Sequence, residues 1–309
     1  MIESLRPMSL GELLDRTFLL YRRNFLLFVG IATLGPAAYL FFELLTIGPA
    51  LASSKTPGGN LTALASVGLG LMVGIVIMLA GMAISQAATV KAVAAVHLGR
   101  TITVGGAYKA LRGRFFRVLG VFLLVILLVG IGIGVIAVAS ALVGTLAVVG
   151  GSQAGTAGTI IGGLVGLAAV VVGAVLGITI YVRFSLSIQA CVVEDLSPIA
   201  SLKRSAVLSK GARSRVLAIY FIFTVLAIIV GGVFSAVSLG MGYLIKNPII
   251  SLIVVYLGSF IASSLTGPLA TIGISLLYYD ERVRKEAFDL QLMMATLDEP
   301  MTVAVPSQA

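Results

Sequence analysis

Residues that could perform chemistry are scarce in this sequence. His97 is its only histidine and Cys191 its only cysteine, and the carboxylates are too scattered to form a metal-binding set of recognisable spacing. His97 lies at a basic end of an apolar run, so we expect it to be a solvated loop residue. Glycines four residues apart, such as Gly158, Gly162 and Gly166, are typical of close packing between membrane helices. The sequence therefore predicts neither catalytic activity nor a cofactor.

Polar residues within the apolar stretches are the remaining candidates for a site. Glu43 is the only acidic residue inside a predicted membrane span, and such a carboxylate is a candidate for function. A solvated position at the outer interface explains Glu43 equally well. Small and polar residues also recur at every fourth position of the last predicted span, which is typical of helix packing; the alternative is a path for a solute. The candidate path consists of Glu43, Gln86, Ser259, Ser263, Thr271 and Ser275.

The composition places these residues in a membrane protein. The 309 residues are 59% hydrophobic and only 11% charged, whereas soluble domains carry about 25% charged residues. A spanning helix needs about 20 apolar residues, so the long uncharged stretches predict an all-α protein with six transmembrane helices. The longest stretch, 118–182, holds two of them, with a turn at 150–158. The predicted spans are 25–47, 66–90, 118–149, 159–182, 216–244 and 250–278.

The basic residues predict the orientation. Of the 21 lysines and arginines, 19 fall on one side of the predicted spans, and only Lys55 and Lys246 fall on the other. By the positive-inside rule, we expect both termini in the cytoplasm and the chain in the cell membrane. The net charge of +9 follows from this asymmetry. Because the basic residues lie next to the spans instead of in a separate domain, we expect no nucleic-acid binding.

Three similar segments recur along the chain. They are "SLGELLDRTFLLYRRNF" from Ser9, "TVGGAYKALRGRFFRVL" from Thr103 and "SPIASLKRSAVLSKGARSRVL" from Ser197, and their starts are 94 residues apart. Each begins with a hydroxyl residue that can cap a helix, and each continues with apolar residues at helical spacing. We interpret this as an internal triplication in which an amphipathic cytoplasmic helix precedes each transmembrane hairpin. The alternative is three unrelated linkers.

The repeats define one membrane domain. It covers 1–295, with repeats at about 3–96, 97–190 and 191–284, and 296–309 is expected to be a flexible tail. Near the end of the domain, "YYDERVRKEAFDLQLM" at 278–293 predicts an exposed helix capped by Asp280. The pairs Glu281–Lys285 and Arg282–Glu286 would support this helix at i,i+4 spacing.

The basic residues of these segments are candidates for binding membrane lipids, in particular anionic ones, or an acidic protein partner. The alternative is that these residues only set the orientation of the protein in the membrane. The candidates are Arg22, Arg23, Arg112, Arg114, Arg117, Lys203, Arg204, Lys210, Arg282 and Arg284.

Three stretches also carry a family resemblance. "PMSLGELLDRTFLLYRRNF", "VVEDLSPIASLKRSAVLSKG" and "LLYYDERVRKEAFDL" together resemble the bacterial glycerophosphoryl diester phosphodiesterase membrane-domain family and its stand-alone relatives. The resemblance implies a multi-pass membrane protein. In some members the membrane region is fused to a catalytic barrel of about 250 residues. Roughly 30 residues follow the last predicted span, so we expect no such barrel and no activity from it.

These observations favour a non-enzymatic scaffold or accessory protein that binds lipids or a partner. The alternative is a transporter of a small or lipid-like solute. Pro36 in the first span and Pro268 in the last leave backbone carbonyls without donors, which predicts kinks. A polar cavity bounded by these prolines would favour transport, and a solid core would favour a scaffold.

Overall fold

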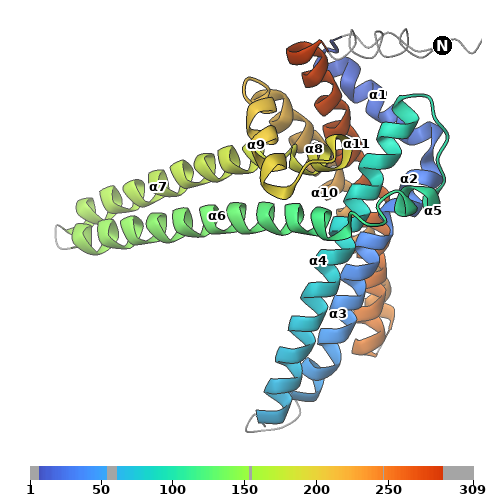
Figure 1. Cartoon of the computed structure of the whole chain (residues 1–309). Coiled ribbons are helices and arrows are strands. Elements are labelled where there is room, and N and C mark those ends of the chain that lie inside the picture. The colour runs from blue at the N-terminus through green and yellow to red at the C-terminus, as the bar shows by residue number, and fades with distance from the viewer. Residues whose placement is uncertain (1–6, 54–60, 153–154, 246, 288–309) are drawn as a thin grey trace, which may run out of the picture.

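The protein is helical throughout the part that its computed structural model describes, which comprises residues 7–53, 61–152, 155–245 and 247–287 (Figure 1). No strand occurs in these ranges. The helices are α1 (Leu10–Arg23), α2 (Phe25–Ala32), α3 (Leu34–Ser53), α4 (Leu61–His97), α5 (Val104–Lys109), α6 (Phe115–Ser152), α7 (Gly155–Phe184), α8 (Ser187–Glu194), α9 (Pro198–Leu208), α10 (Arg213–Leu244) and α11 (Pro248–Glu286).

Six helical segments of the described chain are long and apolar enough to cross a membrane, which confirms the predicted number. They correspond to the six predicted spans, although several extend further at their basic ends. They are Phe25–Thr46, Gly68–His97, Phe115–Ser152, Gly155–Glu194, Arg213–Leu244 and Ile249–Glu286.

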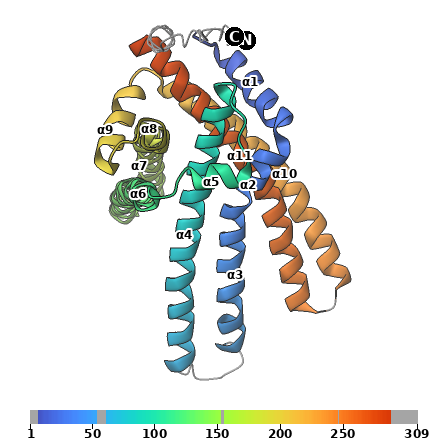
Figure 2. The same ribbon diagram turned by 45° about the vertical axis from the view of Figure 1, so that its right-hand side comes forward.

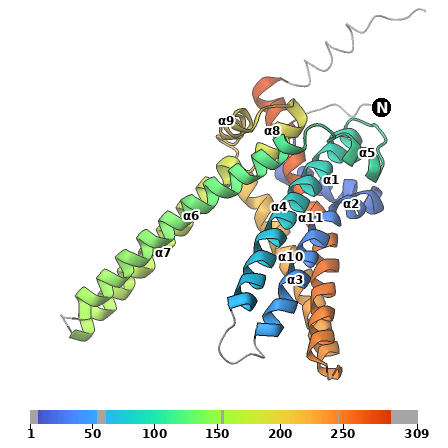
Figure 3. The same cartoon turned by 60° about the horizontal axis from the view of Figure 1, so that its bottom comes forward.

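The long helices pack in three consecutive pairs, α3 with α4, α6 with α7, and α10 with α11. The first and third pairs extend in similar directions, whereas α6 and α7 project away from them (Figures 1 and 3). Only Val118 and Val121, near its start, are buried along the described length of α6. The side chains of this arm therefore rely on lipid or on another molecule for cover.

Glycine permits the close approach of α6 and α7. A Cβ placed on Gly162 would lie 2.2 Å from the carbonyl oxygen of Ala147, and one on Gly166 would lie 3.1 Å from the Cα of Gly144. No side chain fits at the first distance. The close packing expected at these glycines is therefore confirmed.

The first span is interrupted at Thr33, three residues before Pro36. Pro36 has no N–H to donate to the carbonyl of Ala32. The hydroxyl of Ser85 on α4 donates to that carbonyl instead, at 3.1 Å, and Tyr108 on α5 donates to the neighbouring carbonyl of Ile31. In contrast, α11 continues as a helix through Pro268.

Short helices begin directly after each of the three predicted start residues. Ser9 forms a complete capping box with Glu12, and Thr103 caps α5 by accepting a bond from the N–H of Gly106 at 3.1 Å. Ser197 makes no side-chain cap, and Pro198 fills the first helical position of α9. The three helices therefore begin where they were predicted to begin, and two of the three hydroxyl residues cap them.

Each short helix packs against a different set of helices (Figure 2). Helix α5 lies against α2 and α4, α9 lies mainly against α6, α7 and α8 and also touches α11, and α1 lies mainly against α11. Thus α5 and α9 make most of their contacts with helices that precede them, and α1 makes most of its contacts with α11. Together these contacts form a closed cycle around one end of the molecule. We call this end the base.

The main buried core of the described chain lies in this base. Residues of the short helices and of the basic ends of the long helices meet there, and the far ends of the long helices remain exposed. Fully buried side chains of the core include Leu13, Phe28, Ile31, Leu186, Ile272 and Tyr278.

The separate exposed helix predicted for 278–293 is wrong in the described part. Helix α11 runs without a break to Glu286, and Asp280 is an interior residue with a fully buried side chain instead of a cap. The pairs Glu281–Lys285 and Arg282–Glu286 do form, at 3.0 and 3.2 Å. Residues 288–293 and the predicted tail 296–309 lie outside the described residues.

Candidate functional site

The basic residues of the base fall into two groups, those paired with acidic residues and those left exposed. Arg114 and Arg117, at the start of α6, pair with Asp195 at 3.0 and 2.5 Å. Arg117 also donates to the backbone carbonyl of Asp195 at 3.0 Å. Asp195 follows α8 in a left-handed conformation (φ 56°), which turns the chain toward α9. This cluster fixes the connection between α8 and α9 to α6.

A second cluster ties α9 to the end of α11. Arg204 donates three hydrogen bonds to Glu194, at 2.9 to 3.0 Å, and a further one to Glu286 at 2.7 Å. Tyr278 donates to Glu194, and Arg282 donates to Glu286 at 3.2 Å. The bonds to Glu286, and also those to Glu194, raise the pKa of the Arg204 guanidinium above its usual range. Arg204 is therefore a structural cation.

A third cluster fastens the segment before α1 to α11. The carboxylate of Asp280 accepts bonds from the backbone N–H of Met8 at 2.6 Å, from Arg215 at 2.6 Å and from Arg284 at 2.8 Å. Arg215 and Arg284 also donate to the carbonyl of Met8, at 2.9 and 2.7 Å. Glu281 binds the same Arg215 at 2.8 Å. This cluster closes the cycle of helix contacts.

Sequence reasoning missed the extent of this pairing. Arg215 was not among the candidates. The guanidinium of Arg183 lies over the ring of Phe184, at 5.9 Å from the ring centroid. The sequence feature that indicates this pairing is the clustering of the few acidic residues. "VVEDL" and "YYDERVRKE" hold most of those that the base uses.

The second group of cations is exposed and forms no ion pair with any residue that the structure describes. Each short helix contributes two of them. Arg100, Arg183 and Arg213 also belong to this group but lie outside the short helices. The six that lie on or just after the short helices are Arg22 and Arg23 of α1, Lys109 and Arg112 at and after the end of α5, and Lys203 and Lys210 on and after α9. We call these six residues the cationic platform. Lys109 was not predicted as a site residue.

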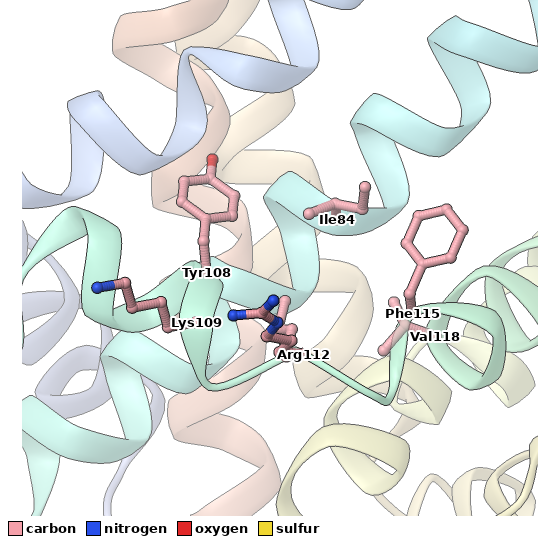
Figure 4. A pocket seen from close by; sticks show the side chains of 7 residues that line it. Ile84, Tyr108, Lys109, Arg112, Phe115 and Val118 are labelled. Carbon is pink, nitrogen blue, oxygen red and sulfur yellow. The ribbon is translucent and has the colours of Figure 1, made fainter.

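A pocket of about 340 Å³ lies beside one part of this platform (Figure 4). It is bounded by α4, α5 and the start of α6. Its walls are almost entirely apolar, and the amino group of Lys109 and the guanidinium of Arg112 lie on the same side of it, away from Phe115 and Val118. Its lining residues are Ile84, Tyr108, Lys109, Leu111, Arg112, Phe115 and Val118.

The residues of the predicted polar path are not brought together around a described cavity. Ser263 is exposed, Ser275 is buried and donates to the carbonyl of Thr271 at 2.6 Å, and the remaining members, Glu43, Gln86 and Ser259, are half-buried on α3, α4 and α11. Neither of the two best-formed pockets in the described chain is lined by these residues, by Pro36 or by Pro268.

The expectation that His97 is a solvated loop residue is wrong. It is the last residue of α4, its ring lies 5.2 Å from that of Tyr279, and both ring nitrogens are buried without a hydrogen-bond partner among the described residues. Gln189, 1% exposed on α8, also has an unpartnered side-chain oxygen. No group of three or more potential metal ligands occurs in the part of the chain that the structure describes.

The fold and this site define a helical, multi-pass membrane protein with a tightly ion-paired base. Comparison with family models, with curated proteins and with solved structures found no match to the chain. The resemblance to the glycerophosphoryl diester phosphodiesterase membrane domain therefore stays a prediction.

Proposed function

We propose that this protein is a non-catalytic scaffold of the cell membrane that gathers anionic lipids at the cationic platform, with both termini in the cytoplasm. The observation that carries the proposal is the division of the basic residues at the base. The ion-paired clusters anchor α9 and the segment before α1 to α11, and they tie the start of α6, which follows α5, to Asp195. Each short helix, together with the turn after it, keeps two further cations exposed. Each basic residue near an anionic surface contributes about 1 kcal/mol, so six at fixed positions give a substantial preference for anionic head groups.

The triplication is part of this proposal. The closed cycle of contacts supports it, because α1, α5 and α9 take corresponding places against successive parts of the chain. Each of them also donates side-chain hydroxyls to backbone carbonyls of its neighbour. Tyr21 donates to Leu265, Tyr108 to Ile31, and Ser205 to Arg183. Three unrelated linkers would have no reason to share this arrangement.

The platform is tested by replacing its six cations with glutamine, which keeps helix propensity. Arg114 and Arg204 are left intact because their loss would break the ion pairs that hold the base together. We expect the substituted full-length protein to retain fewer phosphatidylglycerol molecules in native mass spectra at low salt, with unchanged retention of phosphatidylcholine.

The matched control replaces Arg22, Arg23 and Arg112 with lysine, which preserves the charge and should preserve lipid retention. If the six-glutamine protein retains phosphatidylglycerol as well as the parent does, the platform is a signal for orientation only. If it loses an acidic copurifying protein instead of lipid, the platform serves a protein partner.

The proposed orientation makes a separate prediction. Cysteines introduced at the exposed Ser152 and Asn247 should react with an impermeant thiol reagent applied to intact cells. Cysteines at the exposed Thr101 and Lys210 should react only after the membrane is opened. Cys191 is buried and adds little background. Labelling of Thr101 from outside would exclude cytoplasmic termini.

A further inference from the structure

We propose that the pocket between α4, α5 and the start of α6 holds a single anionic phospholipid, with its phosphate at Lys109 and Arg112 and an acyl chain between Ile84 and Val118. This inference rests on the proposed function and assigns one site and one ligand class within it. The pocket volume of about 340 Å³ lies at the lower end of the usual range for ligand sites, about 300–1,000 Å³. It therefore accommodates part of one lipid.

The charges at the pocket suit a phosphate. Arg112 and Lys109 are both exposed, and neither forms an ion pair with a described acidic residue. A guanidinium can bind phosphate through two parallel hydrogen bonds, and a lysine can add a point charge beside it. The hydroxyl of Tyr108 is already engaged with the carbonyl of Ile31, so it is not available to the ligand.

The neighbouring arginines show that this exposure is local. Arg114 and Arg117 lie within five residues of Arg112 and are both held by Asp195. One short run of sequence thus contains two cations that stabilise the base and two that remain available beside an apolar hollow. This distribution places charge where a head group would be and apolar surface where a chain would be.

The location of the pocket favours a lipid over a soluble phosphate compound. Its far wall consists of Ile84, Phe115 and Val118, which belong to two of the membrane-spanning segments. The ring of Phe116 lies 5.1 Å from that of Phe115 and is 84% exposed, so it adds apolar surface beside this wall that a lipid chain can cover. A free phosphate ion would leave the apolar walls uncovered.

Three full-length variants test the site, each titrated with phosphatidylglycerol in detergent and observed by native mass spectrometry. K109Q/R112Q removes the proposed phosphate ligands, and we expect the affinity of the most tightly bound lipid to fall about thirty-fold. I84F fills the pocket while leaving every charge in place. It should abolish binding of the most tightly bound lipid. R183Q/R213Q removes two exposed cations that belong neither to the platform nor to the pocket lining, and it should leave the tight site unchanged.

The outcomes separate this site from the platform as a whole. If R183Q/R213Q weakens the tightest lipid as much as K109Q/R112Q does, exposed cations attract lipid without a specific pocket, and the inference is overturned. The same holds if I84F has no effect, if glycerol 3-phosphate competes as well as the lipid, or if the variants lose a dimer instead of a lipid. If K109Q/R112Q leaves the tightest lipid unchanged, the pocket is excluded, and the six-glutamine protein then decides whether the platform is excluded as well.

Discussion

Replacing Asp280 with asparagine is expected to lower the free energy of unfolding by about 3 kcal/mol, because it removes one partner of a buried ion pair. The side chain of Asp280 is fully buried, and it binds Arg215, Arg284 and the backbone of Met8. Asparagine has nearly the same shape but no charge. Among the described residues, Arg215 would then keep only one carboxylate partner, Glu281, at 2.8 Å. Unfolding can be followed in detergent by the reactivity of the buried thiol of Cys191, the only cysteine in the chain.

D195N is the matched control for this experiment. It also removes one carboxylate that binds two arginines, but the side chain of Asp195 is 47% exposed. Exposed ion pairs contribute about 1 kcal/mol or less, so D195N should lower the free energy of unfolding by no more than this amount. Equal effects of the two substitutions would show that the Asp280 cluster does not hold the base together.

The second large effect is expected from G162V, which should force α6 and α7 apart. The first atom of the new side chain would lie 2.2 Å from the carbonyl oxygen of Ala147, and backbone on both helices must shift to relieve this contact. Such overpacking typically costs about 1–3 kcal/mol. Spin labels at the exposed Val138 on α6 and Val172 on α7 should report a longer and broader distance distribution.

G163V provides a control one residue away. A Cβ on Gly163 meets no atom within 4 Å, so valine there should leave the distance between the labels unchanged. If G162V leaves it unchanged as well, the close contact between α6 and α7 does not exist in the membrane protein.

The spans could be predicted from the sequence because lipid imposes a simple requirement on it. Each span must present about 20 apolar residues, and the uncharged stretches show these directly. The starts of the short helices could also be predicted, since capping depends on residues such as Ser9 and Glu12 that are neighbours in the chain. Both inferences use local information.

The site could be predicted only in part. The basic residues were identified, but the chain alone could not show that Arg114 and Arg204 are bound to acids while Arg112 is not. For Arg114 this distinction depends on Asp195, which is 81 residues away. For Arg204 it depends on Glu286, which is 82 residues away, and on Glu194, which is 10 residues away but on another helix. The pocket was missed for the same reason, since α4, α5 and α6 come together only in the folded protein. His97 was misplaced because its burial depends on contact with Tyr279.

The attachment of Met8 to Asp280 has a consequence for how the protein is made. The two residues are 272 positions apart, so the bond joins the segment just before α1 to α11, which are the first and last helices of the described chain. During synthesis at about 5–20 residues per second, α1 therefore emerges and waits at the membrane surface until α11 has been inserted. Until then its apolar face has no intramolecular partner on α11, and chaperones or the bilayer itself must shield it. A chain that ends before residue 280 would have every earlier span in place, but its helix α1 would have no Asp280 to bind.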